Sequence, residues 1–125
     1  MPLTITTAKG DTHRFTVEVA RTPEQQARGL MERQSLAPDK GMVFPYEPPQ
    51  AVAFWMKNTL IPLDIIFIGA DGRIINIAEN TTPYSLEPVP SAGPALAVLE
   101  IGGGLSAELG IEPGDRVLHR IFPGE

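Results

Sequence analysis

The side chains best suited to chemistry in this 125-residue chain lie close together in segment 54–64. The segment holds the chain's single tryptophan and four polar or charged residues, namely Trp55, Lys57, Asn58, Thr59 and Asp64. A tryptophan can stack on a ligand, a lysine can pair with an anion, and amide, hydroxyl and carboxylate groups can orient a ligand's polar atoms. The segment therefore predicts a small concave binding site at the Trp55–Asp64 corner.

The same corner also has a structural interpretation. Asn58 and Thr59 are residue types that hydrogen-bond to their own backbone in turns. In that case Lys57 would lie in solvent, and Trp55 would only cover part of the core.

Two carboxylates lie inside apolar runs, Asp64 before Ile65 and Ile66, and Glu100 after Leu99. An isolated buried carboxylate is very costly, so each must be paired, hydrogen-bonded or turned to solvent. Asp64 is expected either to cap backbone N–H groups of the preceding Asn58-Thr59-Leu60 loop or to act in a site. Glu100 either faces solvent or pairs with a cation such as Lys57, Arg28 or Arg33. If the two carboxylates converged at about 5–9 Å, they could serve as the acid and base of a hydrolase or lyase.

Composition excludes several classes of function. With no cysteine, the chain has no disulfide framework, zinc ribbon, thiol nucleophile or iron–sulfur cluster. Two histidines offer little for a metal site or a Ser-His-Asp triad, so we expect neither a metal nor a cofactor. Gly102–Gly104 is not followed by Lys-Ser or Lys-Thr, so it is not a phosphate-binding P-loop.

Charge and hydropathy limit the kinds of partner that the chain is expected to bind. The net charge is −5 and no basic run occurs, which argues against nucleic acid. The longest apolar-leaning stretch, 60–68, contains a proline and an aspartate and is too short to span a bilayer. No signal peptide is visible at the start, an expectation equally compatible with a cytoplasmic chain and with one that has lost its leader.

The elements that must position these residues are mostly strands. The length predicts a single domain over 1–125. Apolar alternation and turn residues predict strands at 3–8, 13–20, 42–44, 51–56, 63–68, 73–79, 95–101 and 116–122. One short helix is expected over 23–28, because Thr22 and Gln25 form a capping box, Pro23 starts the helix and Gly29 ends it. A single helical turn is also expected at 105–109.

The arrangement of these strands gives the fold class. Segment 63–79 is expected to be a central hairpin, with its loop at 69–72 and both faces covered. Pro45 is expected to stop the strand that precedes it, leaving 45–50 as a loop or a sheet edge. The proline-rich segment 80–94 predicts a surface loop. Together these features predict a mainly β, single-domain β-sandwich or partly closed barrel of seven or eight short strands.

Several motifs resemble those of the domain of unknown function 192 family, over roughly residues 12–119. The motifs are Arg28-Gly29-Leu30-Met31, Gly41-Met42-Val43-Phe44, Phe54-Trp55-Met56-Lys57-Asn58-Thr59 and Ile61-Pro62-Leu63-Asp64. The resemblance implies a mainly β, sandwich-like domain, and many members of the family carry a signal peptide and are exported. No enzymatic activity is established for the family, so no catalytic residues carry over. The resemblance makes an exported or periplasmic protein the expectation, with a cytoplasmic one as the alternative.

The leading hypothesis is a non-enzymatic binding module for an unknown small molecule or protein. Its site would comprise six residues with two more at the rim, namely Trp55, Lys57, Asn58, Thr59, Asp64 and Glu100, with Arg28 and Arg33. The alternatives are a hydrolase or lyase that uses Asp64 and Glu100, and a purely structural or protein-interaction domain. A monomer or a weak homo-oligomer is expected.

Overall fold

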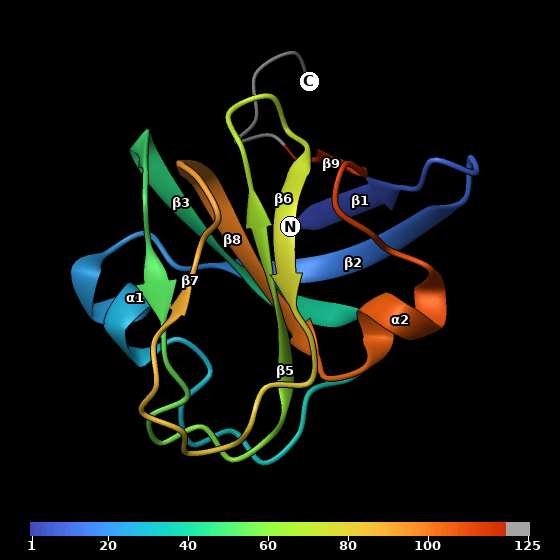
Figure 1. Cartoon of the computed structure of the whole chain (residues 1–125). Helices are drawn as coiled ribbons and strands as arrows, with labels where there is room; N and C mark the ends of the chain where they lie inside the picture. Colours follow the sequence, from blue (N-terminus) through green and yellow to red (C-terminus); the bar gives the residue numbers. More distant parts are fainter. Residues whose placement is uncertain (120–125) are drawn as a thin grey trace.

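The fold is built around one curled β-sheet (Figure 1). The computed structural model describes residues 1–119. Seven strands form the sheet, namely β1 (Pro2–Thr6), β2 (Thr12–Val19), β3 (Lys40–Gln50), β5 (Leu63–Ile68), β6 (Ile74–Ala78), β8 (Ala95–Gly102) and β9 (Arg116–Leu118). Their order across the sheet is β6-β5-β8-β3-β2-β1-β9. The paired neighbours are antiparallel except β2 and β3, which run parallel.

The two margins of this sheet meet at one end. The backbone N–H of Ile74 on β6 donates to the carbonyl of Asp115 at 2.9 Å, and Val117 on β9 donates to Gly72 at 2.8 Å. The backbones of Arg73 and Arg116 form an isolated antiparallel β-bridge between the same two margins. The sheet is therefore a half-barrel whose edge strands are joined over a few residues.

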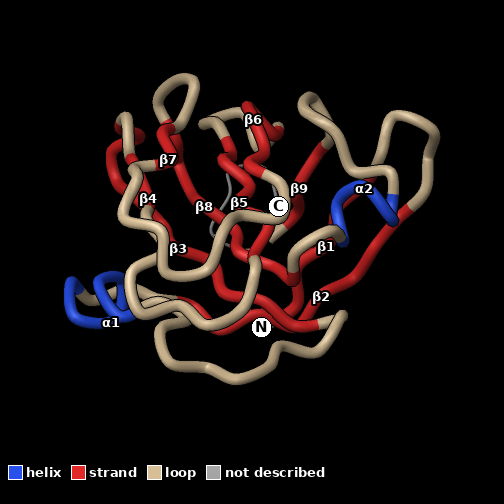
Figure 2. Tube along the Cα trace, turned by 60° about the horizontal axis from the view of Figure 1, so that its bottom comes forward, coloured by secondary structure: helices blue, strands red, loops and turns tan. Residues whose placement is uncertain are grey.

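The remaining elements flank this sheet. A second, two-stranded sheet pairs β4 (Ala53–Phe54) with β7 (Val89–Pro90). The helices α1 (Pro23–Arg28) and α2 (Leu105–Leu109) lie at opposite sides of the molecule (Figures 1 and 2). Figure 2 shows α1 on the same side as β4 and β7, next to β3. That side carries the candidate site.

Two apolar clusters pack on the two faces of the half-barrel. The first contains buried residues from all seven strands of the large sheet, such as Ile5, Val43 and Leu99, and fills the inside of the curl. The second lies on the other face and joins Leu30, which follows α1, to residues such as Phe44 and Phe67. Because β5 and β8 have apolar residues in both clusters, the middle of the sheet is covered on both sides, and every residue of β5 is buried.

The predicted fold class and the helix are confirmed. Residues 1–119 hold nine strands, two of them only two residues long, and the sheet is the partly closed barrel of the prediction. The helix spans Pro23–Arg28, with Thr22 Oγ1 accepting from the N–H of Gln25 at 3.1 Å and the Gln25 side chain accepting from the N–H of Thr22 at 3.1 Å. The helical turn at 105–109 is present as α2.

Three expectations for the strands were wrong. Pro45 does not stop its strand, because β3 continues to Gln50, although 45–50 does lie at a sheet edge, paired with β8 on one side only. The 63–79 hairpin lies at one margin of the sheet rather than at its centre. The strand expected over 51–56 is only Ala53–Phe54, since its partner β7 is a two-residue strand. Of the strand expected over 116–122, the structure shows Arg116–Leu118, and residues 120–122 lie outside the described residues.

Candidate functional site

A cavity of about 280 Å³ opens between α1, β3 and the start of the β4 segment. Residues 26–31, from α1 and the turn after it, form one wall. Phe44 and Tyr46 on β3 and residues 53–55 form the others, and Thr59 and Glu100 complete the lining. Residues from four separate parts of the chain thus meet around one space.

Aromatic side chains form part of the walls of this cavity. Four of the chain's eight aromatic residues line it, namely Phe44, Tyr46, Phe54 and Trp55. The rings of Phe44 and Phe54 meet edge to face, with their centroids 5.0 Å apart and their planes at 85°. Trp55 is 47% exposed, and the ammonium of Lys57 lies 5.1 Å from the centre of its ring. The cavity therefore offers aromatic surface to a ligand, together with one wall that is open to solvent.

Glu100 is the buried polar group of the cavity. It lies on β8 and is only 4% exposed. Its carboxyl forms no hydrogen bond or ion pair with any residue of the described chain. Burial without a compensating partner disfavours the charged form and raises the pKa of Glu100 to about 8. The carboxyl is thus mostly neutral near pH 7 and still has its hydrogen-bonding capacity unused.

The polar groups that share the cavity are largely engaged elsewhere. The amide nitrogen of Gln26 donates to the carbonyls of Ala20 and Pro45, each at 3.0 Å. The hydroxyl of Thr59 donates to the carbonyl of Lys57 at 3.1 Å. Burial, and then the neighbouring Glu100 charge, raise the pKa of Tyr46 to about 12. The walls therefore leave the Glu100 carboxyl facing the cavity.

Gly29 keeps the approach to this carboxyl open. The backbone there has φ 49° and ψ −129°, a conformation that side chains with a Cβ rarely adopt. A Cβ at this position would lie 3.3 Å from the Phe44 ring and 3.8 Å from Oε1 of Glu100. The glycine that ends α1 thus also lines the cavity beside the carboxyl oxygen.

Asp64 has a different environment and a structural role. It is fully buried on β5, and its carboxylate accepts three backbone N–H groups, from Asn80 at 2.7 Å, Gly104 at 2.9 Å and Ser106 at 2.8 Å. These bonds tie β5 to the segment after β6 and to the start of α2. Asp64 does cap backbone N–H groups, but the loop expected from the sequence, 58–60, was wrong, because the donors belong to Asn80, Gly104 and Ser106.

Asp64 and Glu100 project from opposite faces of the sheet. In the β5–β8 register, Ile65 lies opposite Glu100 and Asp64 lies opposite Ile101. Directly opposed residues share a face, and neighbours along a strand alternate. Glu100 therefore faces the second cluster with Ile65, and Asp64 faces the first cluster with Ile101. The sheet separates the two carboxylates, so they cannot act together as an acid and base.

The other predicted site residues divide between the cavity and its surroundings. Trp55, Thr59 and Arg28 line the cavity. Lys57 and Asn58 are exposed beside it, and the carbonyl of Asn58 accepts from the N–H of Glu32 at 2.8 Å.

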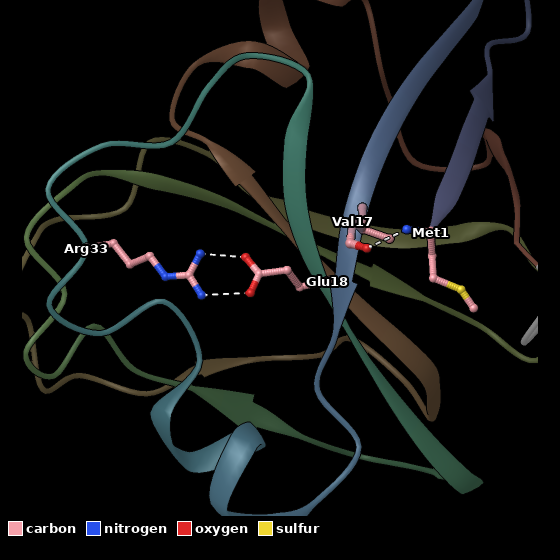
Figure 3. Close-up of polar contacts among 4 residues, drawn as sticks. All are labelled: Met1, Val17, Glu18 and Arg33. Atoms are coloured by element: carbon pink, nitrogen blue, oxygen red, sulfur yellow. Dashed lines mark hydrogen bonds and ion pairs between the residues drawn. The ribbon is translucent and has the colours of Figure 1, made fainter.

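Arg33 does not line the cavity. Its guanidinium forms a two-bond ion pair with Glu18 on β2, with one N–O distance of 2.8 Å (Figure 3). The alternative that Glu100 pairs with Arg28 or Arg33 was wrong, because Arg33 bonds to Glu18 and Arg28 has no ionic partner between residues 1 and 119.

Sequence reasoning missed the walls on α1 and β3. Phe44, Tyr46, Gln26 and Met31 line the cavity, but none of them was a candidate. The two-residue period of a strand places Phe44 and Tyr46 on one face once the strand is known to continue through Pro45. Expecting that strand to stop at Pro45 concealed this signal.

Residues 1–119 contain neither a cluster suited to a metal ion nor a helix suited to a membrane. No three His, Asp or Glu side chains are grouped so that they could hold a metal ion within this part of the chain. No helix there is long and apolar enough to cross a membrane.

Comparison with known proteins places the chain in a family. No curated protein sequence matches it significantly. A crystal structure of a protein of unknown function from Novosphingobium aromaticivorans is similar, with 55% identity and a TM-score of 0.92, covering 95% of this chain and 84% of that one. A Sinorhizobium meliloti protein, described as a proposed transcription regulator, is 44% identical with a TM-score of 0.91, covering 94% of this chain and 91% of that one. The family model DUF192, described as "Uncharacterized ACR", matches residues 4–119, so the chain belongs to the domain of unknown function 192 family.

Proposed function

We propose that this protein is a non-enzymatic binding domain that holds a small molecule in the cavity in front of Glu100. The observation that carries the proposal is that Glu100, a residue 4% exposed, has a carboxyl without a partner in the described chain, in a cavity that four aromatic side chains help to line. Buried polar groups are nearly always hydrogen-bonded, and an unpaired one calls for an explanation. A ligand that supplies the missing partner is the simplest explanation. A volume near 280 Å³ fits a small metabolite rather than a folded partner.

Binding is favoured over catalysis because the cavity lacks an acid–base pair. Asp64 lies across the sheet, so Glu100 is the one carboxyl of the lining. The other titratable groups of the lining are Tyr46, whose pKa is raised to about 12, and Arg28. Neither exchanges a proton readily near neutral pH. Glu100, with a pKa raised to about 8, is thus the one group of the lining that exchanges a proton near neutrality, and an acid–base pair needs a second one.

A small-molecule partner is also favoured over nucleic acid. The Sinorhizobium meliloti relative is described as a proposed transcription regulator, but this chain has a net charge of −5 and no basic run. Phosphate backbones are bound through dense lysine and arginine surfaces.

The test uses the chain's single tryptophan. Trp55 lines the cavity, so its fluorescence should change when a ligand enters. A library of small polar, cationic, anionic and zwitterionic compounds is screened by thermal shift, and hits are titrated against Trp55 emission. Glu100→Leu should weaken a true ligand at least tenfold. Glu108→Gln, an exposed change on α2 at the other side of the molecule, is the matched control and should leave affinity unchanged.

Two results would contradict the proposal. One is a library without any compound that shifts both the melting temperature and Trp55 emission. The other is a set of hits whose affinity is the same in the wild type and in Glu100→Leu.

A further inference from the structure

We propose that the ligand of the Glu100 cavity is a protonated organic amine that carries an anionic group at its other end. The inference rests on the proposed binding function and adds the ligand's chemical class. Three observations support it, namely the unused carboxyl, the aromatic walls and a free arginine at the rim.

The first observation concerns what Glu100 lacks. Its carboxyl has no donor from the described chain, and the nearby amide of Gln26 and hydroxyl of Thr59 already donate elsewhere. A neutral hydroxyl or amide would supply a hydrogen bond but would leave an ionised carboxylate without a counter-charge. An ammonium group supplies both, and charge-assisted bonds are about twice as strong as neutral ones. The best complement to this carboxyl is therefore a cation with N–H donors.

The second observation concerns the walls. Aromatic faces attract ammonium groups because the ring face is electron-rich. The protein already shows this contact at the cavity mouth, where the Lys57 ammonium lies 5.1 Å from the centre of the Trp55 ring. Phe44, Tyr46 and Phe54 continue the aromatic surface inward. A buried carboxyl at the end of such walls is suited to an amine with an apolar body.

The third observation selects among amines. Arg28 lines the same cavity, is exposed, and pairs with no acidic group of residues 1–119. A second positive charge on the ligand would be repelled there, whereas a carboxylate or phosphate would gain a two-bond partner. The cavity thus has an acidic group, Glu100, inside and a basic group, Arg28, at its rim.

Proton linkage follows from these groups. The titratable and charged groups that share the cavity with Glu100 are Tyr46, from β3, and Arg28, from α1. Tyr46 stays neutral up to about pH 12 and guanidinium groups do not lose their proton in proteins, so Glu100 is the group that changes its charge near neutrality. An ammonium binds the ionised form, so a proton leaves the carboxyl when the ligand enters at pH 7. Affinity should therefore rise close to tenfold per pH unit from about pH 5 to pH 7.

The experiment compares four probes of similar shape, namely benzylamine, benzyl alcohol, benzoate and phenylalanine. Each is titrated against Trp55 fluorescence at pH 5, 6, 7 and 8, in the wild type, in Glu100→Gln and in Arg28→Gln. We expect benzylamine and phenylalanine to bind at least tenfold more tightly than benzyl alcohol at pH 7. Glu100→Gln should abolish that preference and its pH dependence. Arg28→Gln should weaken phenylalanine and leave benzylamine unchanged or slightly tighter.

The outcomes separate this inference from the proposed function. If benzyl alcohol or benzoate binds as tightly as benzylamine, or if benzylamine affinity is flat with pH, the amine class is wrong and the binding cavity stands. If the four probes fail but library compounds bind, amines among the hits support the class and their absence refutes it. If no compound binds, the proposed function itself is refuted.

Discussion

Replacing Glu100 with glutamine should stabilise the protein at alkaline pH and leave its stability almost unchanged at acidic pH. Glutamine has nearly the shape of a protonated glutamate and never ionises. The wild-type carboxyl is buried and has no partner between residues 1 and 119, so ionising it in the folded state is costly. The substitution removes that cost without removing a hydrogen bond.

The size of this stabilisation follows from the pKa of Glu100. The folded protein holds this proton up to about pH 8, whereas the unfolded chain loses it near the ordinary pKa of 4.5. The folded state therefore binds more protons between these values, and stability falls as pH rises through that window. The stabilisation is complete below pH 4.5 and is lost once pH passes about 8. Each pH unit lowers the free energy of unfolding by about 1.4 kcal/mol, or about 5 kcal/mol over the whole window.

The assay is urea denaturation of the wild type and Glu100→Gln at half-unit steps from pH 4 to pH 9. Other ionisable groups contribute equally to both proteins, so the difference in free energy of unfolding isolates Glu100. We expect a difference near zero at pH 4 that grows to about 4–5 kcal/mol in favour of Glu100→Gln at pH 8 to 9. A difference that is constant with pH would refute the unpartnered, buried carboxyl on which the proposed site depends.

Three further predictions concern the surroundings of the site. Asp64→Ala should lower the free energy of unfolding by about 3–5 kcal/mol, because three backbone N–H groups, one of them fully buried, lose their acceptor. The ligand affinity of the folded protein should stay the same, and urea denaturation and fluorescence titration check the two parts. Gly29→Ala should lower the free energy of unfolding by about 1–3 kcal/mol, because position 29 has a positive φ. It should also weaken ligand binding, since the new methyl would lie 3.8 Å from the Glu100 carboxyl oxygen. Wild-type affinity in this variant would contradict the view that a ligand reaches the carboxyl past Gly29. Arg33→Gln should lower the free energy of unfolding by less than about 1 kcal/mol, because its ion pair with Glu18 is exposed. The bond to Arg33 lowers the pKa of Glu18, so an NMR titration of the variant should show that pKa returning towards its ordinary value.

The parts of the fold that were predictable are those fixed by neighbours along the chain. The bounds of α1 follow from Thr22, Gln25 and Gly29, which interact within one or two helical turns. The strand Leu63–Ile68 and the turn after it are equally local. The course of β3 is not local, because its continuation to Gln50 depends on pairing with Ala95, far along the chain. Proline patterns say where a hydrogen bond is missing, but they do not say on which side of a strand a partner lies.

The candidate site was predictable in its residue types but not in its geometry. Trp55, Thr59 and Glu100 do share one cavity, while Asp64 lies behind the sheet. Within one strand the two-residue period fixes relative faces, but between β5 and β8 the faces depend on a register of which the sequence gives no sign. A shift of one residue in that register would have placed the two carboxylates together. The walls from α1 and β3 likewise exist only after the parallel β2–β3 pairing brings α1 alongside β3.

The pairing of β1 with β9 also bears on how the protein is made. Ile5 lies opposite Val117, so this contact closes a loop of almost the whole described chain. Contacts of such sequence separation slow folding, and β-rich domains that depend on them fold in milliseconds to seconds. During synthesis the outer edge of β1 has no partner until residues 116–118 have emerged from the ribosome. Newly made chains are therefore the form in which this edge is open to pairing with other molecules.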